Sequence, residues 1–195
     1  MKPVIILASA SKRRSEILTS CGIKHHVYVS NVLEIHNKAR GVVWNVVQNA
    51  KRKALFSTKK YKSNIIIGAD TLVSLGKELI GKPKNSSHAK KLLKDFSGKK
   101  IEVTTGLFVV DTATGKSVSA SKKSALYVRE LSSLDIDGYF KALKPYDKAG
   151  GFSIEGVGSI IFDNIRGSYF NILGLPMGVL SDLFKKIDKN ILKFI

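Results

Sequence analysis

The chain has 195 residues, of which 44% are hydrophobic and 25% are charged, so it can bury a substantial core as one globular domain. That composition excludes a disordered or fibrous protein, and no apolar stretch is long enough to span a membrane as a helix. The formal net charge of +18 permits attraction of polyanions, but only six of the 33 basic residues are arginines, and scattered lysines are typical of a solvated surface.

Strand and helix patterns alternate in the first half of the chain, and long strands follow. Apolar runs and alternating patterns predict strands at 3–8, 25–30, 65–75, 100–111, 117–128 and 159–163. Helical spacing predicts helices at 12–21, 41–57, 86–96 and 132–143, and a last helix that opens at Pro176. We therefore expect a single α/β domain over residues 1–195, with a twisted mixed sheet flanked by helices.

Local signals add detail to these helices. Ser86 or Ser87 is expected to cap the helix 86–96, and Ser132 with Asp135 resembles a capping box. The helix 41–57 is expected to turn one apolar stripe inward, made of Val43, Val46, Val47, Ala50 and Ala54.

The first candidate site follows the strand 3–8, where small hydroxyl residues precede a basic cluster and a helix. Small residues let a ligand approach the backbone, the helix start exposes N–H groups, and Arg13 and Arg14 add bidentate phosphate donors. Ser9 belongs to the same segment. Phosphate binding and an ordinary capped helix with surface arginines are equally consistent with this spacing.

The second candidate site is Gly68-Ala69-Asp70-Thr71, directly after three isoleucines. Ligand sites in α/β sheets gather at strand ends, and a carboxylate there can hold a divalent cation or accept a proton from water. An aspartate that bonds its own backbone in a turn is the competing interpretation of Asp70.

A near match to a P-loop occurs at 76–83. The spacing of the glycines and Lys82 is satisfied, but Pro83 stands where the magnesium-binding Ser or Thr should be. We reject the P-loop and keep Lys82 as a candidate phosphate contact. The four histidines show no metal-ligand spacing.

Taken together, the segments resemble the Maf family of nucleotide pyrophosphatases from residue 4 to about 180. Each motif is weak alone, but their order and spacing are specific. The motifs are Leu7-Ala8-Ser9-x-Ser11-x-Arg13-Arg14, Ala50-Lys51-Arg52-Lys53-Ala54, Gly68-Ala69-Asp70-Thr71, Gly81-Lys82-Pro83, Leu93-x-x-Phe96-Ser97-Gly98-Lys99, Val103-x-Thr105-Gly106, Asp147-Lys148-Ala149-Gly150-Gly151-Phe152-x-Ile154-Glu155-Gly156 and Gly174-Leu175-Pro176.

The resemblance implies a fold similar to the inosine-triphosphate pyrophosphatases, with two lobes around a central cleft. It also implies hydrolysis of a nucleoside triphosphate between the α and β phosphates with a divalent cation, Mg²⁺, Mn²⁺ or Co²⁺. Asp70 matches the catalytic position, and Glu34 with Asp70 is expected to hold the metal, although either carboxylate is free to orient the attacking water. The matched phosphate contacts are Ser9, Arg13, Arg14, Lys53 and Lys82.

Base preference rests on three positions of the resemblance. Arg13 and Thr71 match members that prefer dTTP and UTP. Glu155 departs from that pattern, because those members usually carry Gln there, while members acting on methylated guanosine triphosphate often carry Glu. A carboxylate only accepts hydrogen bonds where an amide also donates, but two positions of three favour pyrimidines.

The competing function is a basic nucleic-acid-binding or cell-division regulatory protein, which the net charge motivates. The sequence contains no recognised nucleic-acid-binding motif, so a nucleotide-pool or house-cleaning hydrolase is the leading hypothesis, with a nucleoside triphosphate as partner and no specific nucleic acid or membrane. The single cysteine, Cys21, excludes an intramolecular disulfide and suits the reducing cytoplasm. The sequence leaves a homodimer open.

Overall fold

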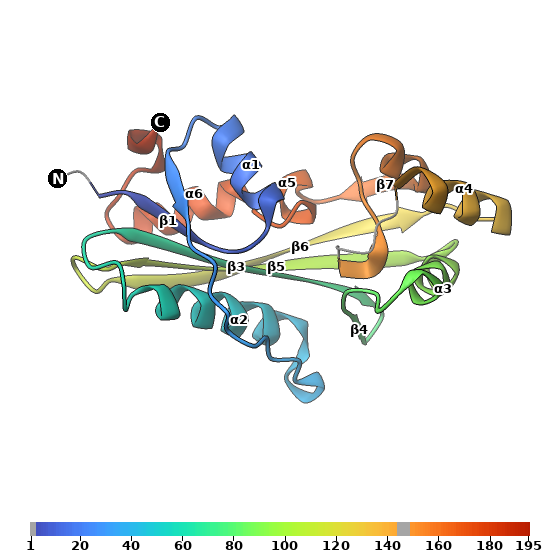
Figure 1. Ribbon diagram of the computed structural model, residues 1–195, viewed down its shortest axis with the longest axis horizontal. Helices are drawn as coiled ribbons and strands as arrows, with labels where there is room; N and C mark the ends of the chain where they lie inside the picture. The colour runs from blue at the N-terminus through green and yellow to red at the C-terminus, as the bar shows by residue number, and fades with distance from the viewer. Residues whose placement is uncertain (1–2, 144–148) are drawn as a thin grey trace.

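The computed structural model describes residues 3–143 and 149–195, and over these residues seven strands form one open mixed sheet (Figure 1). Its order is β2-β1-β3-β5-β6-β7. The short strand β4 lies outside this order and pairs with the later part of β3, past the part that pairs with β1. β1 runs parallel to β2 and β3, and the other neighbouring strands are antiparallel. The strands are β1 (Ile5–Ala8), β2 (His25–Val27), β3 (Ile65–Leu75), β4 (Glu78–Ile80), β5 (Lys100–Asp111), β6 (Ser117–Val128) and β7 (Phe162–Arg166).

Helices cover both faces of the sheet. Figure 1 shows α2 on one face, α1, α5 and α6 on the other, and α3 and α4 at the far end of the long strands. The helices are α1 (Lys12–Ser20), α2 (Gly41–Ser57), α3 (Ser86–Phe96), α4 (Ser133–Leu143), α5 (Tyr169–Ile172) and α6 (Met177–Lys186), with 3₁₀ turns at Lys38–Arg40, Ala149–Gly151, Gly156–Ile161 and Ile191–Phe194. None of the described helices is long and apolar enough to cross a membrane.

The sheet separates two cores because successive side chains of β3 point to opposite faces. Ile65 and Ile67 belong to the larger core, which α1, α3, α4 and α6 cover. Ile66 belongs to a smaller core with Ala50 and Ala54 of α2. The continuous apolar run of β3 thus reflects burial on both faces, as its sequence predicts.

Two glycines let α2 approach the sheet closely. A Cβ at Gly68 would lie 2.0 Å from the Ala50 carbonyl oxygen, and one at Gly106 would lie 2.5 Å from the Val46 carbonyl oxygen. Any side chain at either position would therefore push α2 away. Because Asp70 follows Gly68 by two residues, its side chain points to the same face, towards α2.

Most predicted elements are confirmed, including the helix 41–57 and the long hairpin 100–111 and 117–128. The capping box is present: the Ser132 N–H donates to Asp135 Oδ2 at 2.8 Å, and the Asp135 N–H donates to Ser132 Oγ at 3.2 Å. The last helix begins one residue later than predicted, with Pro176 as its N-cap. The division into two lobes stays a prediction.

Two strand predictions are wrong in extent. The predicted strand 25–30 ends at Val27, because β1 ends at Ala8 and offers no partner farther on. The predicted strand 159–163 is a 3₁₀ turn over Gly156–Ile161, and β7 starts only at Phe162. The Gly158 N–H bonds the Glu155 carbonyl, which closes a turn and delays the strand.

Two helix details are also wrong. Asn85 caps α3 in place of Ser86 or Ser87, since its side chain accepts the His88 N–H at 2.9 Å. On α2, Val43 is 48% exposed and not part of the inward stripe. Two buried asparagines, Asn45 and Asn49, share the covered side of the helix instead. Their side-chain amides hydrogen-bond to a loop, and the helical periodicity of α2 alone could not predict these bonds.

Candidate active site

The site lies where β3 has an open edge. β1 pairs with β3 only up to Gly68, and β4 pairs with it only from Val73. The stretch between them carries Asp70 and Thr71, whose side chains point to opposite faces of the sheet. A ligand at this gap in the edge can therefore reach both side chains.

A cavity of about 820 Å³ occupies this gap. A volume of this size is typical of small-molecule binding sites. The cavity wall includes all nine candidate residues from the sequence, which come from six separate parts of the chain. They are Ser9, Arg13, Arg14, Glu34, Lys53, Asp70, Thr71, Lys82 and Glu155.

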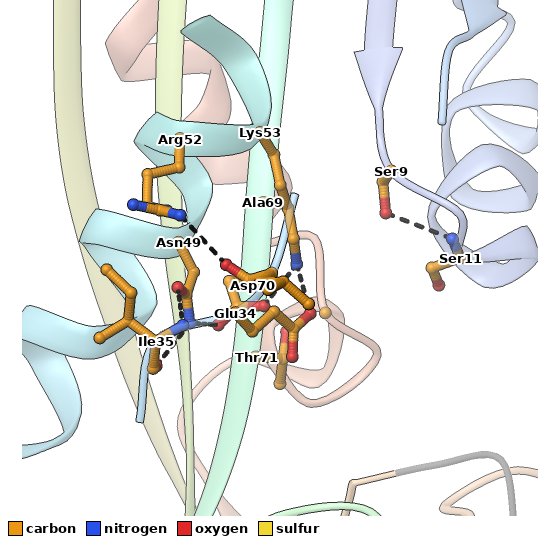
Figure 2. Close-up of polar contacts among 12 residues, drawn as sticks. Ser9, Ser11, Glu34, Ile35, Asn49, Arg52, Lys53, Ala69, Asp70 and Thr71 are labelled. Carbon is orange, nitrogen blue, oxygen red and sulfur yellow. Dashed lines mark hydrogen bonds and ion pairs between the residues drawn. The ribbon is translucent and has the colours of Figure 1, made fainter. Parts of the chain in front are cut away.

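An acidic pair faces a lysine at one side of the cavity. Figure 2 shows Lys53 of α2 between the two carboxylates, with Nζ 2.7 Å from Asp70 Oδ1 and 2.7 Å from Glu34 Oε1. Asp70 is almost fully buried, whereas the Glu34 side chain is 44% exposed. The turn interpretation of Asp70 is thereby wrong, because the residue lies within β3 and its carboxylate bonds α2.

The pKa values of the two carboxyl groups, Asp70 and Glu34, are shifted in opposite directions. Burial raises the pKa of Asp70 above its ordinary value, the charge of Glu34 adds to the rise, and Lys53 opposes it. Burial would also raise the pKa of Glu34, but Lys53 and His36 outweigh it and hold that pKa below its ordinary value. Glu34 is thus the more persistent anion, and Asp70 accepts a proton more readily. Paired acids with such divergent environments are typical of acid–base sites.

The two arginines have different environments. Arg14 is buried and its guanidinium donates to Ser9 Oγ at 2.8 Å, the Gly174 carbonyl at 2.8 Å, the Ala69 carbonyl at 3.0 Å and Thr71 Oγ1 at 2.9 Å. Four of its five N–H groups are therefore committed to the protein. Arg13 instead pairs with Glu155 across the cavity wall, with 2.9 Å between Nε and Oε2. Arg13 is the arginine with more freedom to meet a ligand.

The start of α1 favours the phosphate interpretation of its segment. Ser11 occupies the N-cap position of α1 but makes no side-chain cap bond. Its own N–H donates to Ser9 Oγ at 3.3 Å, a contact that Figure 2 also shows. The helix start is therefore not capped in the usual way, and its first N–H groups stand beside the cavity.

A hydrogen-bond relay fixes the polarity of Thr71. Thr105 Oγ1 donates its only proton to the Asn171 carbonyl at 3.0 Å. In the 2.9 Å hydrogen bond between the two threonine hydroxyls, Thr71 must therefore be the donor and Thr105 the acceptor. Arg14 already donates to one lone pair of the Thr71 oxygen. What Thr71 can offer a ligand is consequently an acceptor and not a donor.

The acidic pair suits a hard divalent cation. Mg²⁺ is usually held by one or two carboxylates together with substrate phosphates, and Asp70 and Glu34 supply two carboxylates beside the cavity. Within the two described ranges, no group of three or more His, Cys, Asp and Glu side chains forms a complete protein site. The donor set therefore fits a cation that arrives with a phosphorylated ligand.

Two site residues, Asn49 and Asn171, escaped the sequence patterns, and Thr105 appeared there only as part of a motif, with no role assigned to it. Asn49 lies one helical turn before Lys53, and that spacing was the available signal for it. Asn171 and Thr105 meet only through tertiary packing. Two residues of the resemblance, Asp147 and Lys148, lie outside the described residues.

Comparison with known proteins identifies the family. A protein from Desulforamulus reducens named dTTP/UTP pyrophosphatase is 40% identical over 185 residues, covering 95% of this chain and 96% of that protein. Proteins of the same name from Clostridioides difficile and Methanosarcina barkeri are each 37% identical, covering 93% and 96% of this chain and 94% and 95% of their own lengths. The family pattern described as Maf-like protein matches residues 4–187, and the chain belongs to this family.

Proposed function

We propose that this protein is a nucleoside triphosphate pyrophosphatase that converts UTP and dTTP to the monophosphate and pyrophosphate in the cytoplasm. The observation that carries the proposal is the cavity at the β3 edge, where a carboxylate pair and several cations face the same space. The names of the relatives support the substrate class.

The cations act on the triphosphate. Arg13, Lys53 and Lys82 line the cavity together with Ser9 and the start of α1. Their charges and N–H groups neutralise the phosphate oxygens in a partly dry site, where such interactions are stronger than in water. Arg14 fixes Ser9 and Thr71 from behind and so serves to position the wall.

The carboxylates act on the attacking water. In this proposal Asp70 accepts one proton as the water oxygen bonds the α phosphorus and the bond to the bridging oxygen breaks, with pyrophosphate leaving. A divalent cation held by Glu34 and Asp70 would neutralise charge on the phosphates. The raised pKa of Asp70 suits a proton acceptor, because it brings the carboxyl closer to neutral pH.

The part of the cavity wall that carries Thr71 and Glu155 favours pyrimidine bases. Thr71 presents only an acceptor, which matches the N3–H of uracil and thymine. Glu155 is held by Arg13, so its negative charge is partly offset where a base carbonyl would approach. The alternative of a methylated guanosine triphosphate rests on Glu155 alone.

A substrate panel tests the proposal. Pyrophosphate release from UTP, dTTP, CTP, GTP and methylated GTP is measured with Mg²⁺, Mn²⁺ or Co²⁺ and with EDTA. We expect UTP and dTTP to give the highest kcat/KM, and we expect EDTA to abolish release. Turnover of methylated GTP above that of UTP would contradict the pyrimidine assignment.

A further inference from the structure

We propose that Asn49 is a positioning residue that fixes the two acidic groups of the site relative to each other. This inference rests on the proposed function. Asn49 is fully buried on α2, and Figure 2 shows it beside both Asp70 and the segment that carries Glu34.

The amide of Asn49 is fully used by these two partners. One N–H donates to Asp70 Oδ2 at 3.0 Å and the other to the Ile35 carbonyl at 3.1 Å, while Oδ1 accepts the Ile35 N–H at 2.7 Å. The reversed amide would place its oxygen against the Asp70 carboxylate and its NH₂ against the Ile35 N–H. The network therefore permits one orientation.

Asn49 links the two acidic groups without carrying a charge, and in this it differs from Lys53. Lys53 also joins Asp70 to Glu34, but through charge, so a bound cation and a triphosphate compete for the same groups. The bonds of Asn49 use the second oxygen of Asp70 and the backbone beside Glu34. These bonds can persist when Lys53 turns to a phosphate, so the spacing of the carboxylates is preserved during the reaction.

The chain supplies a matched control one helical turn away. Asn45 is equally buried, and its side chain bonds the N–H and carbonyl of Asn37 at 2.7 and 2.8 Å and the Gly41 carbonyl at 2.7 Å. It clamps the same segment as Asn49, but its hydrogen bonds among the described residues do not include Asp70. A comparison of the two asparagines thus separates positioning of the acids from simple loop attachment.

The experiment compares Asn49→Leu with Asn45→Leu, since leucine keeps the branched arrangement of side-chain atoms, removes the hydrogen-bonding groups and favours the helix. Folding is checked by thermal unfolding, and loop attachment by hydrogen exchange of the Ile35 and Asn37 amides. Both variants should speed exchange in the loop. Only Asn49→Leu should lower kcat for UTP, by about 10- to 100-fold, with KM changed less than about threefold. Its Kd for Mn²⁺ without nucleotide, measured by electron paramagnetic resonance, should rise by about tenfold or more.

Equal losses of kcat in both variants would show a loop clamp and overturn the proposal, as would wild-type kcat and Mn²⁺ affinity in Asn49→Leu. Should Asn49→Leu fail to fold, Asn49→Asp replaces it, because it keeps the shape and the acceptor for Ile35 but loses both donors. Wild-type kcat in Asn49→Asp would equally overturn the proposal. A wild-type protein that released no pyrophosphate would contradict the proposed function instead, and Mn²⁺ binding would then decide the role of Asn49.

Discussion

The ammonium of Lys53 lies 2.7 Å from Asp70 Oδ1, joining a helix to the open edge of a strand. The contact exists because Gly68 and Gly106 lack side chains that would separate α2 from the sheet. The lysine side chain is only 13% exposed, so its charge acts in a partly desolvated place where a phosphate would feel it strongly.

Replacing Lys53 should therefore impair the enzyme. We expect Lys53→Met to lower kcat/KM for UTP by about 100-fold or more, since it removes a preorganised cation from the site. Lys51→Met, on the exposed side of the same helix, is the control and should keep near wild-type kinetics. Steady-state kinetics of both variants check this, and equal kcat/KM values would remove Lys53 from the site.

Glu155 should control base preference more than catalysis. In Glu155→Gln the amide can donate to a pyrimidine carbonyl, which the carboxylate repels, and the ion pair with Arg13 is lost. One regained hydrogen bond is worth about 1 kcal/mol, so the ratio of kcat/KM for UTP over GTP should rise several-fold. Glu16→Gln, another acid in the cavity wall, is the control. An unchanged ratio in a folded Glu155→Gln protein would end this assignment.

Thr105 should act on specificity through Thr71. In Thr105→Val the Thr71 hydroxyl loses its acceptor and becomes free to donate to N3 of cytosine. We expect the preference for UTP over CTP to fall by roughly fivefold, the equivalent of one hydrogen bond. Thr104→Val is a matched control, because its buried hydroxyl has no hydrogen-bond partner among the described residues. Identical UTP to CTP ratios in both variants would show that the relay does not reach the base.

The ion pair of Asp111 with Lys189, remote from the site, should make the free energy of unfolding depend on pH. Burial would raise the pKa of Asp111, but the Ala113 N–H and Lys189 hold it below its ordinary value. A lowered pKa in the folded state stabilises the protein above the unfolded pKa, and this stabilisation is lost as pH falls through the folded pKa. Lys189→Met should therefore lower the free energy of unfolding by about 1 kcal/mol at pH 7, and the difference should shrink as pH falls through the folded-state pKa of Asp111.

Urea unfolding of this variant from pH 7 to pH 3 checks the pair. Lys193→Met, which changes an exposed lysine nearby, should unfold like the wild type throughout. A deficit in Lys189→Met that stays constant with pH would mean that the Asp111 charge is not its source.

Much of the fold could be predicted from local patterns. The three isoleucines of β3 and the pattern of α2 placed both elements correctly, because burial and amphipathic spacing act over a few residues. The end of β2 and the start of β7 could not be predicted this way. They depend on where a neighbouring strand stops and on a turn closed by Gly158, and both are tertiary facts.

The site likewise has features that the sequence predicts and others that depend on tertiary structure. The resemblance named residues from six parts of the chain, and the structure places them around one cavity. Their partners were not predictable, because Asn49 and Thr105 interact with groups that are near only after folding. Arg13 and Arg14 look alike in sequence, yet burial commits Arg14 to the protein and leaves Arg13 in the cavity wall.

The most direct test of the account follows the phosphorus products of UTP by ³¹P NMR, with the wild-type protein and Asp70→Asn in parallel. The wild-type protein should yield UMP and pyrophosphate in equal amounts with no UDP. Asp70→Asn keeps the shape of the side chain but loses the proton acceptor, so it should be slower by about 10²- to 10⁴-fold. UDP with orthophosphate as first products, or Asp70→Asn activity within a few-fold of wild type, would contradict the account.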